Sequence, residues 1–197
     1  ALSLTDGKRK ALPLKRVFIP KSNGKLRPLG IPCMWDRANQ ALWDLALLPV
    51  AEELSDNNSY GFRPFKGAWD AYAQIHLLFS RKRYAADWVL DADIKGFFDH
   101  LSHDWLIENI PMDKRTLKSC LKAGVMESGI YKASDEGTPQ GGIISPTLAI
   151  IALTGMERFL AERFKPGRSG RGNAKVRFLT RINLVRYADD CVPRTLT

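Results

Sequence analysis

An alternating run of side chains that ends in two adjacent aspartates constrains the fold of this chain more than any other feature. Side chains alternate over residues 182–187 with the period of two that is typical of a β-strand, and the run leads into Asp189 and Asp190. A second apolar stretch, residues 88–90, leads in the same way into an acidic segment that contains Asp93. We therefore expect two strands that each carry carboxylates at one end.

Two carboxylate clusters at strand ends are what a two-metal phosphoryl-transfer site requires. Mg²⁺ prefers oxygen ligands and keeps several waters, so few protein carboxylates suffice when substrate phosphates complete the shell. Asp93 and Asp189 would bridge two ions about 3.5–4 Å apart, one activating a hydroxyl and the other stabilising the leaving pyrophosphate. For either cluster alone, ordinary solvated carboxylates are the simpler interpretation.

Composition favours a globular domain with an anionic partner. The 197 residues are 45% hydrophobic, and the net charge of +9 favours nucleic acid, although a solvated basic surface is the simpler alternative. The three cysteines form no CxxC pair, which argues against a disulfide framework or a zinc site and fits a reducing, cytosolic setting. No apolar run approaches bilayer-spanning length, so no membrane partner is expected.

A basic hairpin is expected over residues 15–31. Asn23-Gly24 is a dipeptide that accepts the positive φ of a tight hairpin turn, and Lys21, Lys25 and Arg27 cluster near it. A basic hairpin tip is usually only a solvent-exposed turn. The alternative interpretation is that its cations bind phosphate.

Apolar side chains at helical spacing predict two helices that face a core. The first, which should end or kink at Pro49, carries a stripe of Met34, Ala38, Leu42 and Leu45. The second helix carries an apolar stripe of Trp69, Tyr72, Ile75 and Phe79. We expect this stripe to pack in the core and not to form a platform on which bases stack.

Capping residues mark three further helices. Ser102 is expected to cap a helix through Ile107, and Asp113 is expected to cap another through about Val125. Ser145-Pro146 supplies the first residues of a third helix. The residues of this helix that are expected to face inward are Leu148, Ile151, Ala152, Gly155 and Phe159.

Other short motifs are less informative. The glycine-rich segment 137–142 lacks the order of a P-loop or a dinucleotide-binding fingerprint, which argues against both functions. His100 and His103 have no third metal ligand nearby, so they are not expected to bind metal. The basic connector 165–175 and Lys8-Arg9-Lys10 offer phosphate contacts to a nucleic acid.

Ordered sequence blocks extend over nearly the whole chain. They are Ile19-Pro20-Lys21 with residues 24–32, Asp36-Arg37, Tyr60-Gly61-Phe62-Arg63-Pro64, residues 93–99, residues 137–142 with Ser145-Pro146, and Tyr187-Ala188-Asp189-Asp190. Together these blocks resemble the reverse transcriptase of group II introns, whereas the last block alone would not be specific.

The resemblance implies an α+β fold of the right-hand polymerase type, with fingers in residues 1–86 and a palm in residues 87–197 whose antiparallel sheet packs on helices. It implies an RNA-directed DNA polymerase that adds deoxynucleotides with two Mg²⁺ ions. Its partners would be an intron RNA template, a DNA primer and dNTPs. The resemblance also implies a maturase role, in which the protein binds its intron RNA and assists splicing. The expected compartment is the cytoplasm of a bacterium or an organellar matrix.

Metal-site residues follow from the same resemblance. Asp93, Asp189 and Asp190 match the catalytic, metal-binding triad, and the carbonyl of Ile94 is a further metal ligand.

Nucleotide-site residues are implied as well. Lys21 and Arg27 match the residues that hold the incoming triphosphate, for which an ammonium and a guanidinium are both suited. Phe98 matches the gate that excludes a ribose 2′-hydroxyl, and Gln140 matches the residue beside the nucleotide's sugar.

The sequence departs from the family pattern after Asp190. Pro193 has no N–H for a sheet ladder, so the returning strand is expected to be two or three residues at most. A thumb is expected to be absent and the palm incomplete, so that primer extension requires these segments to be restored. The alternative function is a non-catalytic RNA-binding splicing cofactor, and the oligomeric state is left open.

Overall fold

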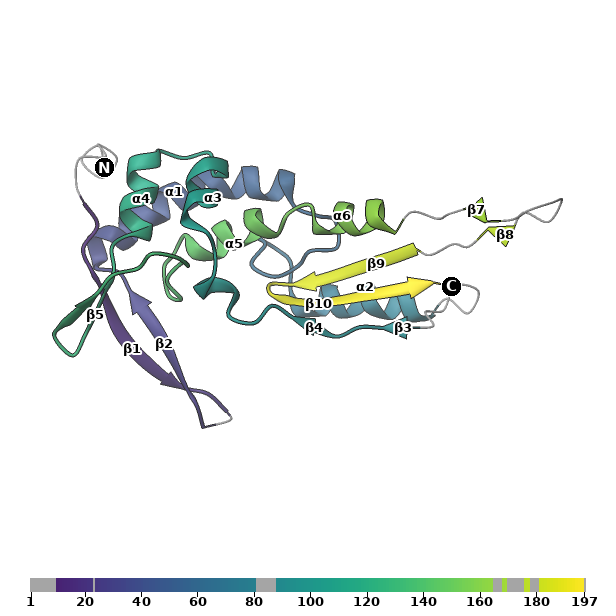
Figure 1. The fold of residues 1–197 in the computed structure, drawn as a ribbon, viewed down its shortest axis with the longest axis horizontal. Helices are drawn as coiled ribbons and strands as arrows, with labels where there is room; N and C mark the ends of the chain where they lie inside the picture. Colours follow the sequence, from purple (N-terminus) through teal and green to yellow (C-terminus); the bar gives the residue numbers. More distant parts are fainter. Residues whose placement is uncertain are drawn as a thin grey trace. The chain divides into compact units, whose positions relative to one another are not determined.

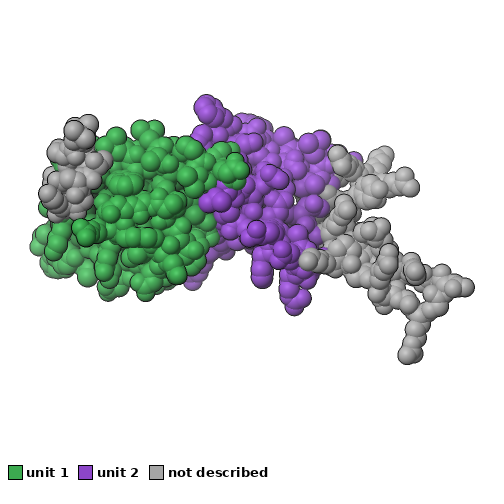
Figure 2. All heavy atoms as spheres, turned by 90° about the horizontal axis from the view of Figure 1, so that it is seen from above, with its two compact units in different colours: residues 1–53, 96–152 green, residues 54–95, 153–197 purple. Residues whose placement is uncertain are grey.

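The computed structural model describes residues 10–22, 24–80, 88–164, 168–169, 176–177 and 181–196 (Figure 1). The chain forms two compact units: unit 1 comprises residues 1–53 and 96–152, and unit 2 comprises residues 54–95 and 153–197 (Figure 2). The boundary between fingers and palm at residue 86 stays a prediction, because compactness does not assign function. Lys8, Arg9 and most of the basic connector 165–175 lie outside the described residues.

Unit 1 contains a four-stranded sheet in the order β2-β1-β5-β6. β1 (Leu14–Pro20) and β2 (Leu26–Ile31) pair antiparallel, and Gly24 between them has a φ of 77°. The predicted hairpin is therefore confirmed, although Asn23 lies outside the described residues. β5 (Val125–Glu127) runs parallel to β1 and pairs antiparallel with β6 (Ile130–Lys132).

The β5–β6 hairpin replaces the end of a predicted helix. α4 (Lys114–Leu121) stops well before Val125, because Gly124 takes a φ of 70° and the chain then enters β5. Ser128 and Gly129 have φ values of 51° and 80°. Two successive left-handed residues make the tight turn of a β-hairpin, so the Ser-Gly dipeptide was the overlooked signal.

Helix α1 (Met34–Leu54) buries a different face from the predicted one. All four predicted core residues are exposed, and the buried side chains are Asp36, Gln40, Leu47 and Ala51. The carboxylate of Asp36 accepts a hydrogen bond from the N–H of Leu12 (3.0 Å), and the side-chain oxygen of Gln40 accepts one from the N–H of Ile143 (2.9 Å). The prediction is wrong because the spacing of apolar residues does not reveal which polar side chains are buried by hydrogen bonds from a loop.

Helix α1 also continues through Pro49, where an end or a kink was predicted, so the helix does not end there. Pro49 has no N–H, so the carbonyl of Leu45 loses its helical donor. Leu45 is 67% exposed, so this part of the helix faces solvent, which is able to satisfy a carbonyl that lacks its helical donor.

Helices α3 (His103–Asn109) and α4 begin at the predicted caps. The hydroxyl of Ser102 accepts a hydrogen bond from the N–H of Trp105 (3.3 Å). The carboxylate of Asp113 accepts hydrogen bonds from the N–H and the hydroxyl of Thr116, both at 2.8 Å. Each side chain thereby satisfies a backbone donor that the first turn of a helix leaves free.

We expect Asp113→Ala to lower the free energy of unfolding by about 1 kcal/mol, because it removes the cap of α4. Hydrogen bonds from the backbone and then the side chain of Thr116 lower the pKa of Asp113. Their stabilisation is therefore complete above the ordinary pKa of an aspartate and is lost as the pH falls through the lowered value. Urea unfolding at neutral and acid pH checks this, since the difference from wild type should shrink in acid.

Ser102→Ala is the matched control for this experiment, because it removes the cap of α3 without removing a titratable group. Its effect should be the same at both pH values. If the effect of Asp113→Ala also stayed the same, the capping carboxylate would not be the source of the stabilisation.

The predicted helix from Ser145 is divided into two. α5 (Ser145–Leu153) begins at the Ser-Pro pair and buries Leu148 and Ile151, as predicted. Gly155 then takes a φ of 89°, and α6 (Met156–Arg163) starts in a new register. The inward orientation predicted for Phe159 is wrong, because this residue of α6 is 65% exposed.

Unit 2 is built on an antiparallel sheet whose inner strand is β10 (Figure 1). β10 (Asp190–Leu196) pairs with β9 (Arg181–Tyr187) along one edge, and β3 (Trp88–Val89) and β4 (Ala92–Asp93) follow one another along the other. Helix α2 (Ala68–Ser80) packs on this sheet, and its buried cluster is Tyr60, Ala71 and Val185 with Ile75 and Leu78. The predicted α+β fold, with an antiparallel sheet packed on helices, is thereby confirmed.

The face of α2 that meets the sheet is not the predicted stripe. Trp69 is 83% and Tyr72 is 59% exposed, and their rings contact each other edge to face with centroids 5.9 Å apart. Ile75 does pack inward, and the side chain of Phe79 lies outside the description. The prediction followed the largest side chains, whereas the small Ala71 is the residue that lies against the sheet.

Strand β10 runs for seven residues, so the prediction of a returning strand of two or three residues is wrong. Pro193 pairs with Leu184 of β9, and its carbonyl accepts a hydrogen bond from the N–H of Leu90 (3.1 Å). In a hydrogen-bonded antiparallel pair each residue donates and accepts on the same side, so the missing donor of Pro193 also faces Leu90. Leu90 lies at the interruption between β3 and β4. Pro193 thus interrupts its neighbour and leaves its own strand intact.

The remaining elements are short. η3 (Phe97–Asp99) is a single 3₁₀ turn, and β7 (Arg168–Ser169) pairs with β8 (Val176–Arg177). Among the described helices, none is long and apolar enough to cross a lipid bilayer.

Candidate active site

The register of the sheet in unit 2 places Asp93 directly opposite Asp190. The two residues are partners in the antiparallel pairing of β4 with β10, so their side chains project from the same face, and both are exposed. Asp189 is joined to this pair through its backbone, because its carbonyl accepts a hydrogen bond from the N–H of Ile94 (3.3 Å). All residues predicted for the metal site therefore lie in one part of one unit.

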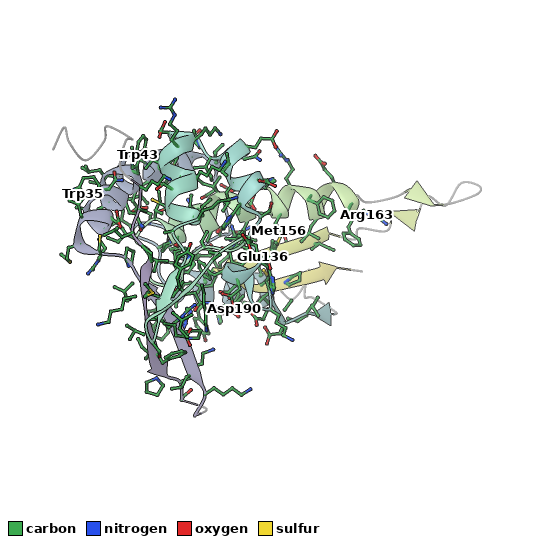
Figure 3. The ribbon with its side chains drawn as sticks, turned by 60° about the vertical axis from the view of Figure 1, so that its left-hand side comes forward. Trp35, Trp43, Glu136, Met156, Arg163 and Asp190 are labelled. Atoms are coloured by element: carbon green, nitrogen blue, oxygen red, sulfur yellow. The ribbon has the colours of Figure 1, made fainter. Side chains whose placement is uncertain are left out.

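The turn between β9 and β10 presents the two adjacent aspartates. Tyr187 pairs with Asp190, which leaves Ala188 and Asp189 as a two-residue turn, and Figure 3 shows Asp190 at this end of the hairpin. Ala188 has a φ of 57°, a conformation that is unfavourable for residues with a Cβ. Strained residues of this kind persist only where surrounding contacts hold them.

Negative charge converges on Asp190. Desolvation by the surrounding protein, followed by the charges of Asp189, Asp93 and Asp91, raises the pKa of Asp190. Like charges directly opposite one another destabilise a sheet, so stability of the fold does not explain the arrangement.

Carboxylate oxygens are the ligands that Mg²⁺ prefers, and this donor set fits a hard divalent cation. Within the described part of the chain, no three side chains of the metal-binding types converge as a ready-made site. The fit therefore rests on the chemistry of the donors and on the face that Asp93 and Asp190 share.

Sequence reasoning missed the loop that supports this turn. The N–H of Arg186 donates to the carbonyl of Asn58, and the N–H of Tyr60 donates to the carbonyl of Arg186, both at 2.9 Å. Gly61 then lies against the turn, where a Cβ on it would be 2.1 Å from the nitrogen of Ala188. Gly61 belongs to one of the recognised sequence blocks, but turn chemistry alone does not reveal what a turn packs against.

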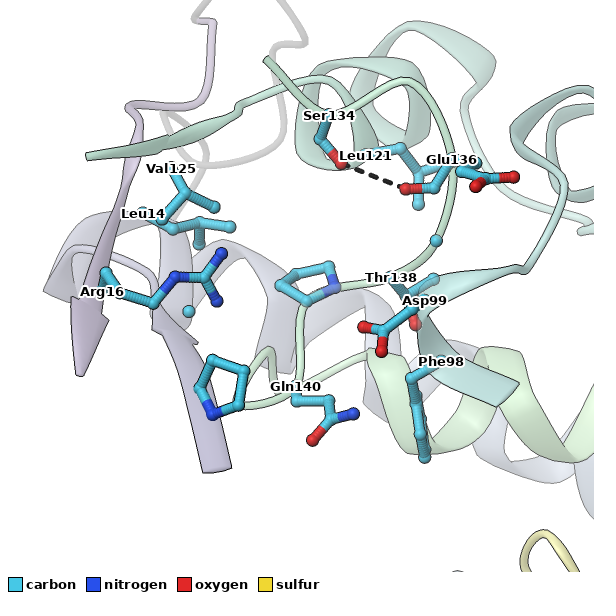
Figure 4. A pocket seen from close by; sticks show the side chains of 14 residues that line it. Leu14, Arg16, Phe98, Asp99, Leu121, Val125, Ser134, Glu136, Thr138 and Gln140 are labelled. Carbon is cyan, nitrogen blue, oxygen red and sulfur yellow. Dashed lines mark hydrogen bonds between the residues drawn. The ribbon is translucent and has the colours of Figure 1, made fainter. Parts of the chain in front are cut away.

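Three of the predicted nucleotide-site residues lie close together in unit 1. The guanidinium of Arg27 donates a hydrogen bond to the side-chain oxygen of Gln140 (2.8 Å). Gln140 and Phe98 line the same cavity of about 110 Å³, shown in Figure 4. Lys21 follows the end of β1 with an exposed side chain and does not line this cavity.

Hydrogen bonds fix the glycine-rich segment to the residues around Phe98. The N–H of Thr138 donates to the carbonyl of Phe98 (2.7 Å), and the ring of the buried His103 donates to the carbonyl of Gly137 (2.6 Å). Gly137 has a φ of 81°, and a Cβ on it would lie 2.7 Å from the carbonyl oxygens of Phe98 and Asp99. His103 therefore anchors this loop.

The sequence profile of the family described as reverse transcriptase (RNA-dependent DNA polymerase) matches residues 19–193. The chain therefore belongs to the reverse transcriptase family. Its relatives narrow the group: it is 36% identical to the group II intron-encoded protein LtrA of Lactococcus lactis subsp. cremoris over 167 residues, which cover 81% of this chain and 27% of LtrA. The predicted resemblance to group II intron reverse transcriptases is confirmed.

Two further relatives show how much of a longer protein the chain matches. Protein YkfC of Escherichia coli is 38% identical over 173 residues, covering 84% of this chain and 45% of YkfC. The putative COX1/OXI3 intron 1 protein of Saccharomyces cerevisiae is 30% identical over 166 residues, covering 81% of this chain and 19% of that protein. The chain thus spans less than half the length of these relatives.

A solved structure supports the fold independently. Telomerase from Candida albicans, determined in complex with a fragment of telomeric RNA, aligns with 97% of this chain and 38% of its own chain at a TM-score of 0.64. The sequence identity is 15%, so this likeness concerns the fold alone.

Proposed function

We propose that the chain carries the fingers and palm of an RNA-directed DNA polymerase, and that Asp93, Asp189 and Asp190 bind its two Mg²⁺ ions. The observation that carries this proposal is the pairing of Asp93 with Asp190 across β4 and β10. Two like charges at opposed positions weaken a sheet, and a bound cation would remove the repulsion. Membership in the reverse transcriptase family supplies the reaction.

The chain's own residues hold and orient the site. Magnesium ions, when bound, lower the pKa of an attacking hydroxyl and stabilise the leaving pyrophosphate. Asp93 and Asp190 offer carboxylates from adjacent strands, and Asp189 offers one from a turn that is bonded to Ile94. We include the carbonyl of Ile94 as a further ligand.

The nucleotide is proposed to contact the residues gathered in unit 1. Arg27 and Lys21 would bind the triphosphate, and the hydrogen bond from Arg27 to Gln140 holds the guanidinium in place beforehand. Phe98 and Gln140 would contact the sugar, because they line one cavity. The short hydrogen bonds around residues 137 and 138 keep this loop close to Phe98.

RNA is the proposed template, with a DNA primer and dNTPs as the other partners. The net charge of +9 supports binding to a polyanion. The same charge supports a second candidate, a splicing cofactor that binds intron RNA without catalysis. Salt-sensitive binding of structured RNA that survives Asp189→Asn would favour that role. A bacterial cytoplasm or an organellar matrix is the proposed compartment.

Primer extension tests the proposed activity. The 197-residue chain, alone and joined to the C-terminal part of LtrA, is supplied with an RNA template, a DNA primer, dNTPs and Mg²⁺. Extension that requires Mg²⁺ and is lost in Asp93→Asn is the expected result. Extension that is unchanged in Asp93→Asn, or no extension by either protein when both are folded, would reject the proposal.

We expect Phe98→Val to weaken discrimination against ribonucleotides by about tenfold to a hundredfold, because a smaller side chain leaves room for the 2′-hydroxyl. Phe98 is 8% exposed, so valine is chosen over alanine to limit the cavity left behind. The measurement is kcat/KM for each dNTP and its ribonucleotide counterpart. Phe97→Val, at the neighbouring ring, is the control and should leave this ratio unchanged.

A further inference from the structure

Arg186 is a buried cation in β9, close to the turn between β9 and β10 that carries Ala188 and Asp189. Its side chain is 2% exposed, and one guanidinium nitrogen donates a hydrogen bond to the carbonyl of Ala188 (3.3 Å). The other two guanidinium nitrogens find no hydrogen-bond acceptor among the residues that the structure describes. A buried charge with so few partners is unfavourable for folding.

The environment of Arg186 does not compensate for its burial. Desolvation lowers the pKa of Arg186, while the charges of Asp56 and Cys191 raise it and that of Arg63 lowers it. An arginine nevertheless remains protonated in proteins. The chain therefore retains a cation here at a cost in stability.

The side chain of Arg186 contacts the backbone of the turn between β9 and β10. It pairs with Cys191, one position from the pairing of Tyr187 with Asp190, so the side chains of Arg186 and Asp190 project to opposite faces of the hairpin. The guanidinium contacts the carbonyl of Ala188, the residue with a φ of 57°. Gly61 packs against the backbone nitrogen of the same residue.

We propose that Arg186 is a positioning residue, which holds the strained turn at Ala188 so that Asp189 and Asp190 are presented correctly to a divalent metal ion. This inference rests on the proposed function of these aspartates. If the inference is right, Arg186 favours metal binding and lowers the free energy of unfolding. A residue with a merely structural role would instead raise the free energy of unfolding.

Arg186→Met tests this inference, because methionine keeps an apolar side chain of similar length without a donor. Three quantities are measured on the whole chain: Mn²⁺ affinity by electron paramagnetic resonance, amide exchange of residues 187–191 by NMR, and the free energy of unfolding in urea. We expect Mn²⁺ affinity to fall and amide exchange in the turn to rise by about tenfold or more, as for loss of a charged hydrogen bond. The free energy of unfolding should stay the same or increase.

Two further variants make the result interpretable. Arg186→Lys keeps a donor and should recover part of the Mn²⁺ affinity, whereas Arg158→Met removes an exposed arginine of α6 and should leave all three quantities unchanged. The inference would be overturned if Arg186→Met left both the Mn²⁺ affinity and the amide exchange of the turn unchanged. It would also be overturned if these two quantities changed only in parallel with a lower free energy of unfolding. If the wild-type chain binds no Mn²⁺, the proposed function fails, and the exchange of the turn amides alone decides the positioning role.

Discussion

Asp189→Asn should lower the rate of metal-dependent primer extension by more than about a thousandfold, because a neutral amide is a poor ligand for Mg²⁺ and the charge stabilisation of the transition state is lost. The substitution keeps the shape of the side chain, and the carbonyl of Asp189 still accepts the N–H of Ile94. Folding should therefore be retained. Single-turnover extension at saturating dNTP measures the effect on chemistry.

Asp91→Asn is the matched control for this substitution. Asp91 is an exposed carboxylate that also raises the pKa of Asp190, but it lies outside the proposed triad. The extension rate of Asp91→Asn should stay within about threefold of wild type. The corresponding change in activation free energy is much smaller than the change expected for loss of a metal ligand. Equal losses in both variants would mean that general negative charge, and not ligation by named residues, supports the reaction.

Gly61→Ala should destabilise unit 2 by about 3 kcal/mol or more, because the added methyl group would overlap the backbone of the turn between β9 and β10. The new Cβ would lie 2.1 Å from the nitrogen and 2.8 Å from the Cα of Ala188, and neither backbone atom can move without disturbing the pairing of β9 with β10. Urea unfolding measures the stability, and NMR shifts of residues 187–191 report the displaced turn.

Gly67→Ala is the control in the same segment. A Cβ at Gly67 would meet only a carboxylate oxygen of Asp70, at an ordinary contact distance of 3.7 Å. Its unfolding free energy should change by no more than about 0.5 kcal/mol. If Gly61→Ala were as well tolerated as Gly67→Ala, the close packing of the loop on the turn would be refuted.

The parts of this fold that are encoded locally could be predicted from the sequence. Asn23-Gly24 indicates a hairpin and Ser102 and Asp113 indicate helix caps, because each depends on contacts within a few residues. The aspartates were predicted to lie at strand ends for the same reason, since the alternating pattern defines the strand that delivers them.

The parts that depend on distant contacts could not be predicted. The buried face of α1 is decided by loops that donate to Asp36 and Gln40, and these loops are far away in the sequence. The length of β10 depends on Leu90, which places the interruption opposite Pro193 in the neighbouring strand. Local propensity carries no information about such partners.

The candidate site shows the same division. The types of its residues were apparent from the sequence, but the direct opposition of Asp93 and Asp190 depends on the register of two strands. The support from Gly61 and Arg186 also became apparent only with the fold, because it is a matter of close approach and burial.

The most direct test of the metal site is the effect of Mg²⁺ on the unfolding free energy of wild type and Asp93→Asn. In EDTA the variant should be more stable than wild type by roughly 0.2–1 kcal/mol, because one of two opposed charges has been removed. Added Mg²⁺ should stabilise wild type by about 1.4 kcal/mol for each tenfold excess over the dissociation constant, and should have little effect on the variant. Equal stabilisation of both proteins, or of neither, would contradict the assignment of Asp93 and Asp190 to a divalent-metal site.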